Sequence, residues 1–144
     1  MGLSQSKTEK LRQMFKKFPE VLVVYLFGSQ AKGETQPLSD FDFAILTENA
    51  LDLDERALLI GEITSVLETD QIDVVFLNQT RTVSLKFRII SEGKLIYCTV
   101  EDQRIKFEEK IIGEYHLLKP FLDEYDRCFL EEVKSYGRRQ GESD

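Results

Sequence analysis

The chain has 144 residues, of which 42% are hydrophobic and 31% charged, and its net charge is −7. These values are typical of one globular domain. They argue against direct nucleic-acid binding, because that binding depends on neutralising phosphates with lysine and arginine. No apolar run approaches the roughly 18 residues of a membrane span, and no secretory signal opens the chain. We therefore expect a cytoplasmic protein that binds neither nucleic acid nor membrane.

Apolar patterning predicts four helices and four strands. The helical segments carry apolar residues at three- and four-residue spacing, whereas the strands are short runs of β-branched and aromatic residues. In chain order we expect a helix over 6–18, strands over 21–27 and 41–46, a helix over 51–67, a strand over 72–77, a helix over 82–91, a strand over 94–98 and a helical segment over 101–136. This order predicts an α/β fold, with a small mixed β-sheet, flanking helices and a long C-terminal helical segment.

Two helices have apolar faces that can be assigned from their spacing. The face expected in the helix over 51–67 consists of Leu51, Ala57, Leu58, Ile60, Ile63 and Leu67. The stripe expected along the last helix consists of Ile111, Tyr115, Leu118, Leu122, Tyr125 and Phe129. That second stripe is narrow, as in a helix that packs along another helix.

The last helical segment is long for so small a core. Pro120 lies within it, and we expect a kink or break there because proline removes a backbone hydrogen bond. The expected organisation is a core over 1–100, a helical extension over 101–136 and a flexible tail over 137–144. The extension packs either on its own core or on a partner, in a homodimer or a hetero-oligomer.

Residues with functional chemistry lie at the ends of three predicted strands. Gly28 and Ser29 end the first strand, where exposed N–H groups and a hydroxyl can bind phosphate oxygens. Asp40 and Asp42 lie two residues apart at the start of the next strand, so their carboxylates share one face. Asp73 lies at the start of a third strand and can converge with them at one sheet edge.

Clustered carboxylates repel one another unless a cation neutralises them. Mg²⁺ prefers carboxylate ligands together with substrate phosphates. The residues therefore predict a site for phosphoryl or nucleotidyl transfer that uses one or two divalent ions. A P-loop is excluded: the outer glycines Gly28 and Gly33 have its spacing, but Glu34 stands where its lysine is required.

Gly28-Ser29, ten further residues and Asp40-x-Asp42 resemble the signature of minimal nucleotidyltransferases of the DNA polymerase β superfamily. Further residues that fit the family pattern are Ala31, Lys32, Gly33, Ser39 and Asp73. Gln30 departs from it, since family members often carry arginine there. The resemblance covers about residues 20–98 and implies a polymerase β-like fold. In length the chain resembles the MNT antitoxins of HEPN/MNT toxin–antitoxin pairs.

The resemblance also implies residue roles. Asp40, Asp42 and Asp73 would be the catalytic metal ligands for two Mg²⁺ ions. The nucleotide-binding residues would be Gly28, Ser29, Lys32 and Ser39. The implied reaction transfers AMP from ATP to a hydroxyl, with a tyrosine of a cognate HEPN toxin as acceptor.

Two other functions stay open. One is a binding module that neutralises a toxin by complex formation while its own site is vestigial; the complete set of three aspartates argues against it. The other is a small-molecule nucleotidyltransferase, although 144 residues leave little room for a second substrate-binding domain. His116, Cys98 and Cys128 are interpreted as structural or surface residues, and Phe41 and Phe43 as core residues.

Overall fold

The computed structural model describes residues 3–28 and 41–142, and in the last helix it describes side chains as far as Glu124, Leu122 excepted. Four helices and four strands lie in these ranges. In chain order they are α1 (Gln5–Phe15), β1 (Val21–Phe27), β2 (Phe41–Thr47), α2 (Leu53–Leu67), β3 (Ile72–Phe76), α3 (Val83–Glu92), β4 (Lys94–Cys98) and α4 (Glu101–Glu142). The predicted α/β fold with a small mixed sheet is confirmed.

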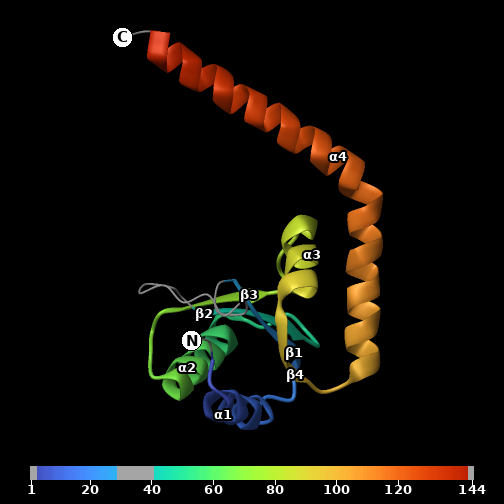
Figure 1. Cartoon of the computed structure of the whole chain (residues 1–144). Helices are drawn as coiled ribbons and strands as arrows, with labels where there is room; N and C mark the ends of the chain where they lie inside the picture. Colours follow the sequence, from blue (N-terminus) through green and yellow to red (C-terminus); the bar gives the residue numbers. More distant parts are fainter. Residues whose placement is uncertain (1–2, 29–40, 143–144) are drawn as a thin grey trace.

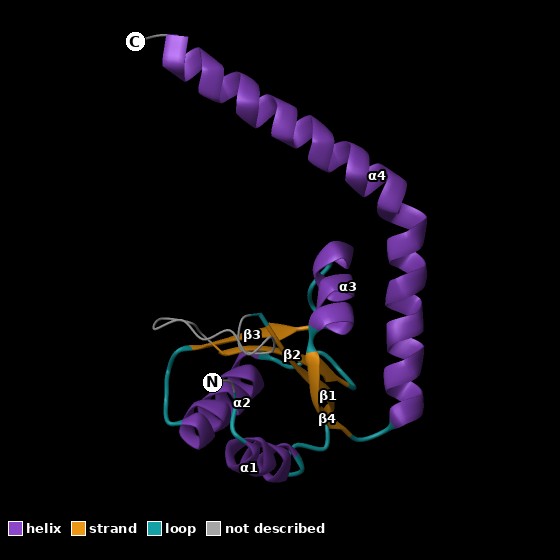
Figure 2. Ribbon diagram, viewed as in Figure 1, coloured by secondary structure: helices purple, strands orange, loops and turns teal. Residues whose placement is uncertain are grey.

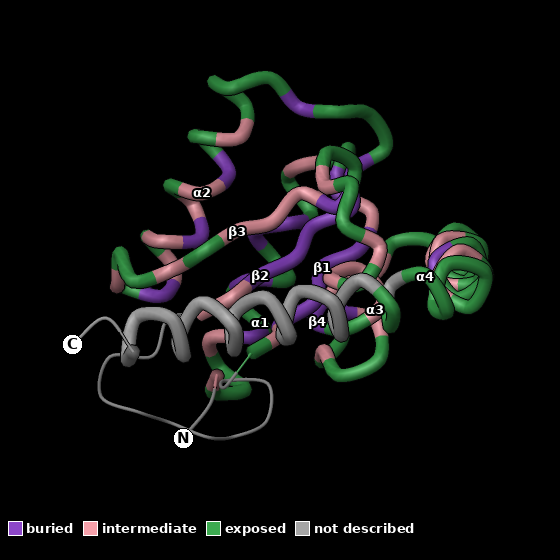
Figure 3. Tube along the Cα trace, turned by 90° about the horizontal axis from the view of Figure 1, so that it is seen from above, coloured by how far each residue is buried: buried purple, intermediate pink, exposed green. Residues whose placement is uncertain are grey.

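The sheet has the strand order β3-β2-β1-β4, so β1 and β2 are central. β1 pairs antiparallel with both β2 and β4, whereas β2 and β3 are parallel. Figure 3 shows that buried residues are concentrated in the two central strands. Both faces of those strands are covered, which explains why their sequences are almost continuously apolar.

Helices cover the two faces of the sheet (Figures 1 and 2). On one face, α1 and α2 form a core with alternate residues of β1, β2 and β4, including the fully buried Phe15, Phe43 and Ile63. Phe41 packs against the same core, so both phenylalanines near the second strand's start are core residues, as predicted. On the other face, α3 contributes the buried Ile89 to a smaller cluster with the remaining residues of the central strands.

Helix ends differ from the predictions where a specific cap or turn intervenes. α1 ends at Phe15 rather than Phe18, because the chain tightens into turns before Pro19 and residues preceding proline avoid the helical conformation. α2 begins at Leu53 rather than at 51, because Asp52 is its N-cap and forms a capping box with Glu55.

The apolar face predicted for α2 was partly wrong. The buried residues of this helix are Leu59, Ile63 and Leu67, at a spacing of four. Leu58, which the prediction placed on this face, is 59% exposed. The choice between adjacent leucines depends on the orientation in which the helix packs on the sheet and α1, and local periodicity does not determine that orientation.

α4 packs on the domain along its first part. Ile111 is buried, and Tyr115 stacks on Phe87 of α3 with ring centroids 3.8 Å apart. α4 then changes direction near residue 120 on the colour scale of Figure 1, and Pro120 lies inside the helix, which agrees with the predicted kink. The helix continues to Glu142, beyond the predicted end at 136. In the described ranges, we find no helix with the length and hydropathy of a membrane span.

Candidate functional site

Asp42 and Asp73 are brought together by the parallel pairing of β2 with β3. In this pairing Asp42 lies directly opposite Asp73. In-register neighbours on adjacent strands project from the same face, and the strands are about 4.8 Å apart. Along β2, Asp42 alternates with core residues so that it shares the face of Ala44, which belongs to the cluster under α3. The two carboxylates therefore lie at one end of the sheet, on its α3 side.

Gly28 lies immediately beside Asp42, the carboxylate of this pair that is nearer to β1. It directly follows β1, whose last residue Phe27 pairs with Asp42. Its φ angle is 78°, in the left-handed region that favours glycine. A Cβ at this position would lie less than 3.0 Å from Asp42 Oδ2. Glycine thus meets two requirements at once: the chain turns sharply at the strand end, and the backbone packs closely against a carboxylate.

A cavity of about 170 Å³ opens on the α3 side of Gly28. Its lining combines the strand end, Phe27 and Gly28, with three side chains of α3, Leu85, Arg88 and Glu92. The guanidinium Nε of Arg88 lies 3.4 Å from a carboxylate oxygen of Glu92. Spacings of three and four place these α3 residues on one face of the helix. The sequence interpretation missed Arg88 and Glu92, and their spacing on α3 was the only signal that could have indicated them.

Four of the predicted site residues lie outside the described residues: Ser29, Lys32, Ser39 and Asp40. Among the side chains that the structure describes, no group of three histidine, cysteine or acidic residues could hold a metal ion. The described part of the site thus supplies two carboxylates, Asp42 and Asp73. Carboxylate oxygens are hard donors of the kind Mg²⁺ prefers, so the donor chemistry fits this ion.

The only histidine and the described cysteine lie elsewhere. His116 is exposed on α4, with its ring edge-on to Phe87 at a centroid distance of 6.2 Å. Cys98 is half-buried at the end of β4, where burial and a hydrogen bond with Glu101 raise the pKa of its thiol. A protonated thiol is a poor nucleophile and metal ligand. Cys128 has no described side chain.

Comparison with known sequences identifies one family and two named relatives. The model of the family described as polymerase beta nucleotidyltransferase matches residues 9–102. The chain is 32% identical over 117 residues to protein adenylyltransferase MntA of Shewanella oneidensis, a match that covers 81% of each chain. It is 27% identical over 139 residues to protein adenylyltransferase MntA of Aphanizomenon flos-aquae, covering 90% of this chain and 89% of that one.

Solved structures show the same similarity in three dimensions. The fold is similar to a chain in a toxin–antitoxin crystal structure with AMP-PNP, with a TM-score of 0.69, 29% identity and coverage of 88% of this chain and 99% of that one. It is also similar to a chain in the structure of a tri-AMPylated Shewanella oneidensis HEPN toxin in complex with an MNT antitoxin, with a TM-score of 0.67, 26% identity and the same coverage. The similarity thus extends over most of the chain, beyond the residues that carry the motif.

Proposed function

Because the chain belongs to the polymerase β family of nucleotidyltransferases, we propose that it is an antitoxin that transfers AMP from ATP to a tyrosine hydroxyl of a HEPN-type toxin. The observation that carries this proposal is the placement of Asp42 opposite Asp73, next to the strand-end glycine Gly28. The two relatives named as protein adenylyltransferases support the reaction. The structure of an AMPylated HEPN toxin with its antitoxin supports the acceptor.

The nucleotide would be held at the end of β1. The backbone of Gly28 and the hydroxyl of Ser29 bind the β- and γ-phosphates, since N–H groups exposed at such a turn attract phosphate oxygens. Lys32 adds positive charge, and Ser39 adds a hydroxyl next to the first aspartate. The described part of this arrangement is Gly28, whose missing Cβ leaves room for the Asp42 carboxylate to pack against the strand end.

The metal site would be formed by Asp40, Asp42 and Asp73. Two Mg²⁺ ions bound there would neutralise the phosphates and stabilise the charge that develops during transfer. The described pair fits this role because its carboxylates are in register on adjacent strands.

The transfer itself needs an acceptor oxygen placed in line with the leaving group. That oxygen attacks the α-phosphorus of ATP and forms a new P–O bond, while the bond from the α-phosphorus to the bridging oxygen breaks and pyrophosphate leaves. Asp73 is exposed at the sheet edge, so a protein acceptor can reach it. We assign it the role of accepting the proton of the attacking hydroxyl.

The partner would contact the part of α4 beyond its packing on α3. Leu117 and Phe121 lie there, 74% and 70% exposed, and large exposed apolar side chains that gather in one place indicate an interaction site. The net charge of −7 favours a basic partner such as an RNA-cleaving toxin. The beginning of α4 is held on the domain by the stacking of Tyr115 on Phe87.

Mass spectrometry of the HEPN-type partner after incubation with ATP and Mg²⁺ tests the proposal. Wild-type protein should add adenylyl groups to a tyrosine. Asp42→Asn should abolish the addition while it preserves partner binding, because it removes a charged ligand and keeps the side-chain shape. Asp54→Asn, the same change at an exposed position in the first turn of α2, is the matched control and should transfer normally.

Two outcomes would contradict the proposal. A partner that gains no adenylyl mass, yet is inhibited equally by wild type and Asp42→Asn, would indicate a binding module. An unmodified and uninhibited partner, together with adenylylation of a small molecule, would indicate a small-molecule nucleotidyltransferase.

A further inference from the structure

The cavity beside Gly28 contains one cationic side chain that the proposed mechanism does not use. Arg88 of α3 lines this cavity together with Gly28 itself, so its guanidinium belongs to the same space as the strand end to which we assign phosphate binding. The side chain of Arg88 is 71% exposed, and a ligand can therefore reach it.

The excess of negative charge around Gly28 favours a cationic side chain at this place. On the α3 side of this end of the sheet, the described ionisable side chains include three carboxylates, Asp42, Asp73 and Glu92, and Arg88. Lys94 begins β4 at the same end, but it pairs with Leu26, which belongs to the core on the opposite face. In the sequence between Gly28 and Asp42 the only basic residue is Lys32. A triphosphate brings further negative charge, which divalent ions shared with the aspartates neutralise only in part.

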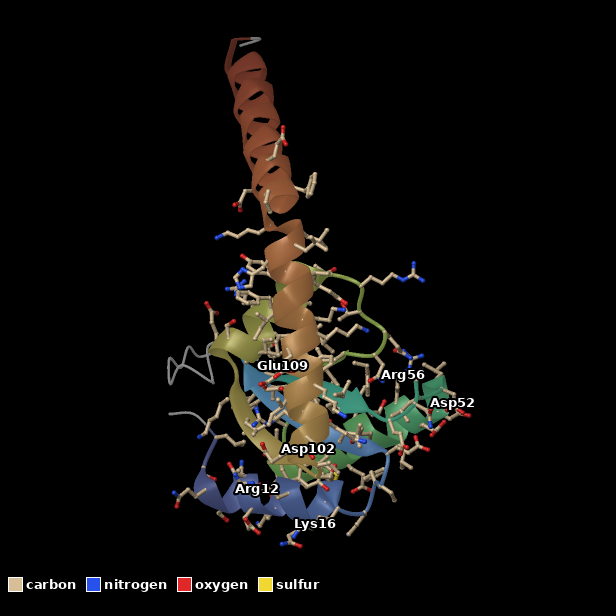
Figure 4. All side chains as sticks on the ribbon, turned by 90° about the vertical axis from the view of Figure 1, so that its right-hand side faces the viewer. Arg12, Lys16, Asp52, Arg56, Asp102 and Glu109 are labelled. Carbon is tan, nitrogen blue, oxygen red and sulfur yellow. The ribbon has the colours of Figure 1, made fainter. Side chains whose placement is uncertain are left out.

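Other basic side chains are less suitable for this role. Arg12 lies on α1, Lys16 is the C-cap of that helix, and Arg56 lies on α2 (Figure 4). Both of these helices cover the face of the sheet opposite α3. Arg104 is held between Glu101 and Glu108 of its own helix.

The ion pair between Arg88 and Glu92 is a weak competitor for a phosphate. The Glu92 side chain is 49% exposed, and the pair is 3.4 Å apart within one helix. Exposed pairs of this kind contribute little to stability, whereas a guanidinium can form two parallel hydrogen bonds with a phosphate group. A bound phosphate can therefore displace Glu92 from Arg88.

We propose that Arg88 is a phosphate-binding residue for the nucleotide, and that its guanidinium exchanges Glu92 for the phosphates held at Gly28. The inference rests on the proposed nucleotidyl-transfer function and adds a residue from α3, 60 positions away from Gly28 along the chain. Glu92 acts in the free protein as the pairing group that keeps the guanidinium beside the cavity.

Competition against a fluorescent ATP analogue, with Mg²⁺ and the full-length chain, tests this role. The probes are ATP, AMP and inorganic triphosphate. Arg88→Gln should weaken the binding of ATP and of inorganic triphosphate by about tenfold to a hundredfold, as expected for the loss of a charge-assisted hydrogen bond. The binding of AMP should change far less. Arg88→Lys should retain part of the affinity for ATP and inorganic triphosphate that Arg88→Gln loses. Glu92→Gln should increase the affinity for ATP by up to about fivefold, because it releases the guanidinium from an exposed ion pair.

Arg81→Gln is the matched control. Arg81 is exposed and precedes α3 at the opposite end of that helix, so all three probes should bind this variant as they bind wild type. Thermal unfolding of each variant checks that folding is intact; little change is expected because both arginines are exposed.

Several results would overturn the inference. If Arg88→Gln weakened the binding of AMP and of ATP equally, the cavity would hold the nucleoside. Unchanged ATP binding with reduced transfer would mean that Arg88 contacts the acceptor. If Glu92→Gln weakened ATP binding, the carboxylate itself would contact the nucleotide. If wild-type protein binds no ATP, the proposed function itself is wrong. If wild-type protein binds ATP and Arg88→Gln binds it equally well, only the inference about Arg88 is wrong.

Discussion

Replacing Gly28 by alanine should damage both the stability and the activity of this protein. Gly28 has a φ angle of 78°, and the left-handed conformation costs an L-residue about 1–2 kcal/mol. The added Cβ would lie less than 3.0 Å from Asp42 Oδ2. Relief of that overlap requires a shift of the Asp42 side chain or of the β1 end, at a typical cost of about 1–3 kcal/mol.

The two contributions together lower the free energy of unfolding by about 2–5 kcal/mol. For a domain of this size, that change corresponds to a fall in Tm of about 10 °C. Activity should fall further than stability, because a shift of about 1 Å in a reacting group can cost about a hundredfold in rate. At a temperature where Gly28→Ala is still folded, AMP transfer should therefore be about a hundredfold slower than in wild type.

Gly61→Ala is the matched control for this experiment. Gly61 lies inside α2, and a Cβ there would meet nothing within 4 Å. Alanine in a helix interior is more stable than glycine by about 0.5–1 kcal/mol, so this variant should melt slightly higher than wild type and transfer AMP normally. The assays are thermal unfolding by circular dichroism and mass spectrometry of the acceptor.

Full transfer activity in a folded Gly28→Ala protein would refute the reasoning, whatever its Tm. It would mean that the position of Asp42 against the strand end does not matter for the chemistry. An unchanged Tm would refute the separate claim that the left-handed φ and the close approach require glycine.

Three other predictions concern separate parts of the molecule. Asp73→Asn should abolish transfer in the mass-spectrometric assay while the protein still folds, because the carboxylate is exposed; normal transfer would exclude it as ligand and base. Leu117→Lys and Phe121→Lys should weaken partner binding in calorimetry by at least about tenfold and change the free energy of unfolding by less than about 0.5 kcal/mol. Burial and a hydrogen bond to Glu108 raise the pKa of Tyr25 above its ordinary value of 10.0. Above pH 10.0 the unfolded state therefore loses this proton first, stability falls as pH rises, and Tyr25→Phe should make that fall shallower in urea titrations at alkaline pH.

Local patterns in the sequence were sufficient for the existence and type of each element. The apolar run at 21–27 and the shorter runs that follow predicted the strands, because strand and helix periodicities depend on neighbouring residues only. Glycine and proline predicted where several helices and strands end, because their effect on the backbone is also local. The order of Gly28, Asp42 and Asp73 along the chain also predicted the chemistry that we propose for the site, since this prediction needs only residue type and spacing.

Helix orientation and strand pairing depend on contacts between residues far apart in sequence. Local spacing placed Leu58 on the buried face of α2, and only packing on the sheet and α1 selected Leu59 instead. Likewise, the convergence of Asp42 and Asp73 was an expectation until the parallel register of β2 and β3 placed them opposite each other.

Tertiary structure alone decided which residues of α3 line the cavity beside Gly28. Arg88 and Glu92 have no sequence motif that connects them to Gly28, yet the chain returns through α3 so that they line the cavity beside it. The same is true of α4, whose first part packs on α3 while Phe121 is exposed. The physical reason is that a sequence determines the local conformations that each segment favours, whereas the position of one segment against another is selected by the burial of apolar surface over the whole molecule.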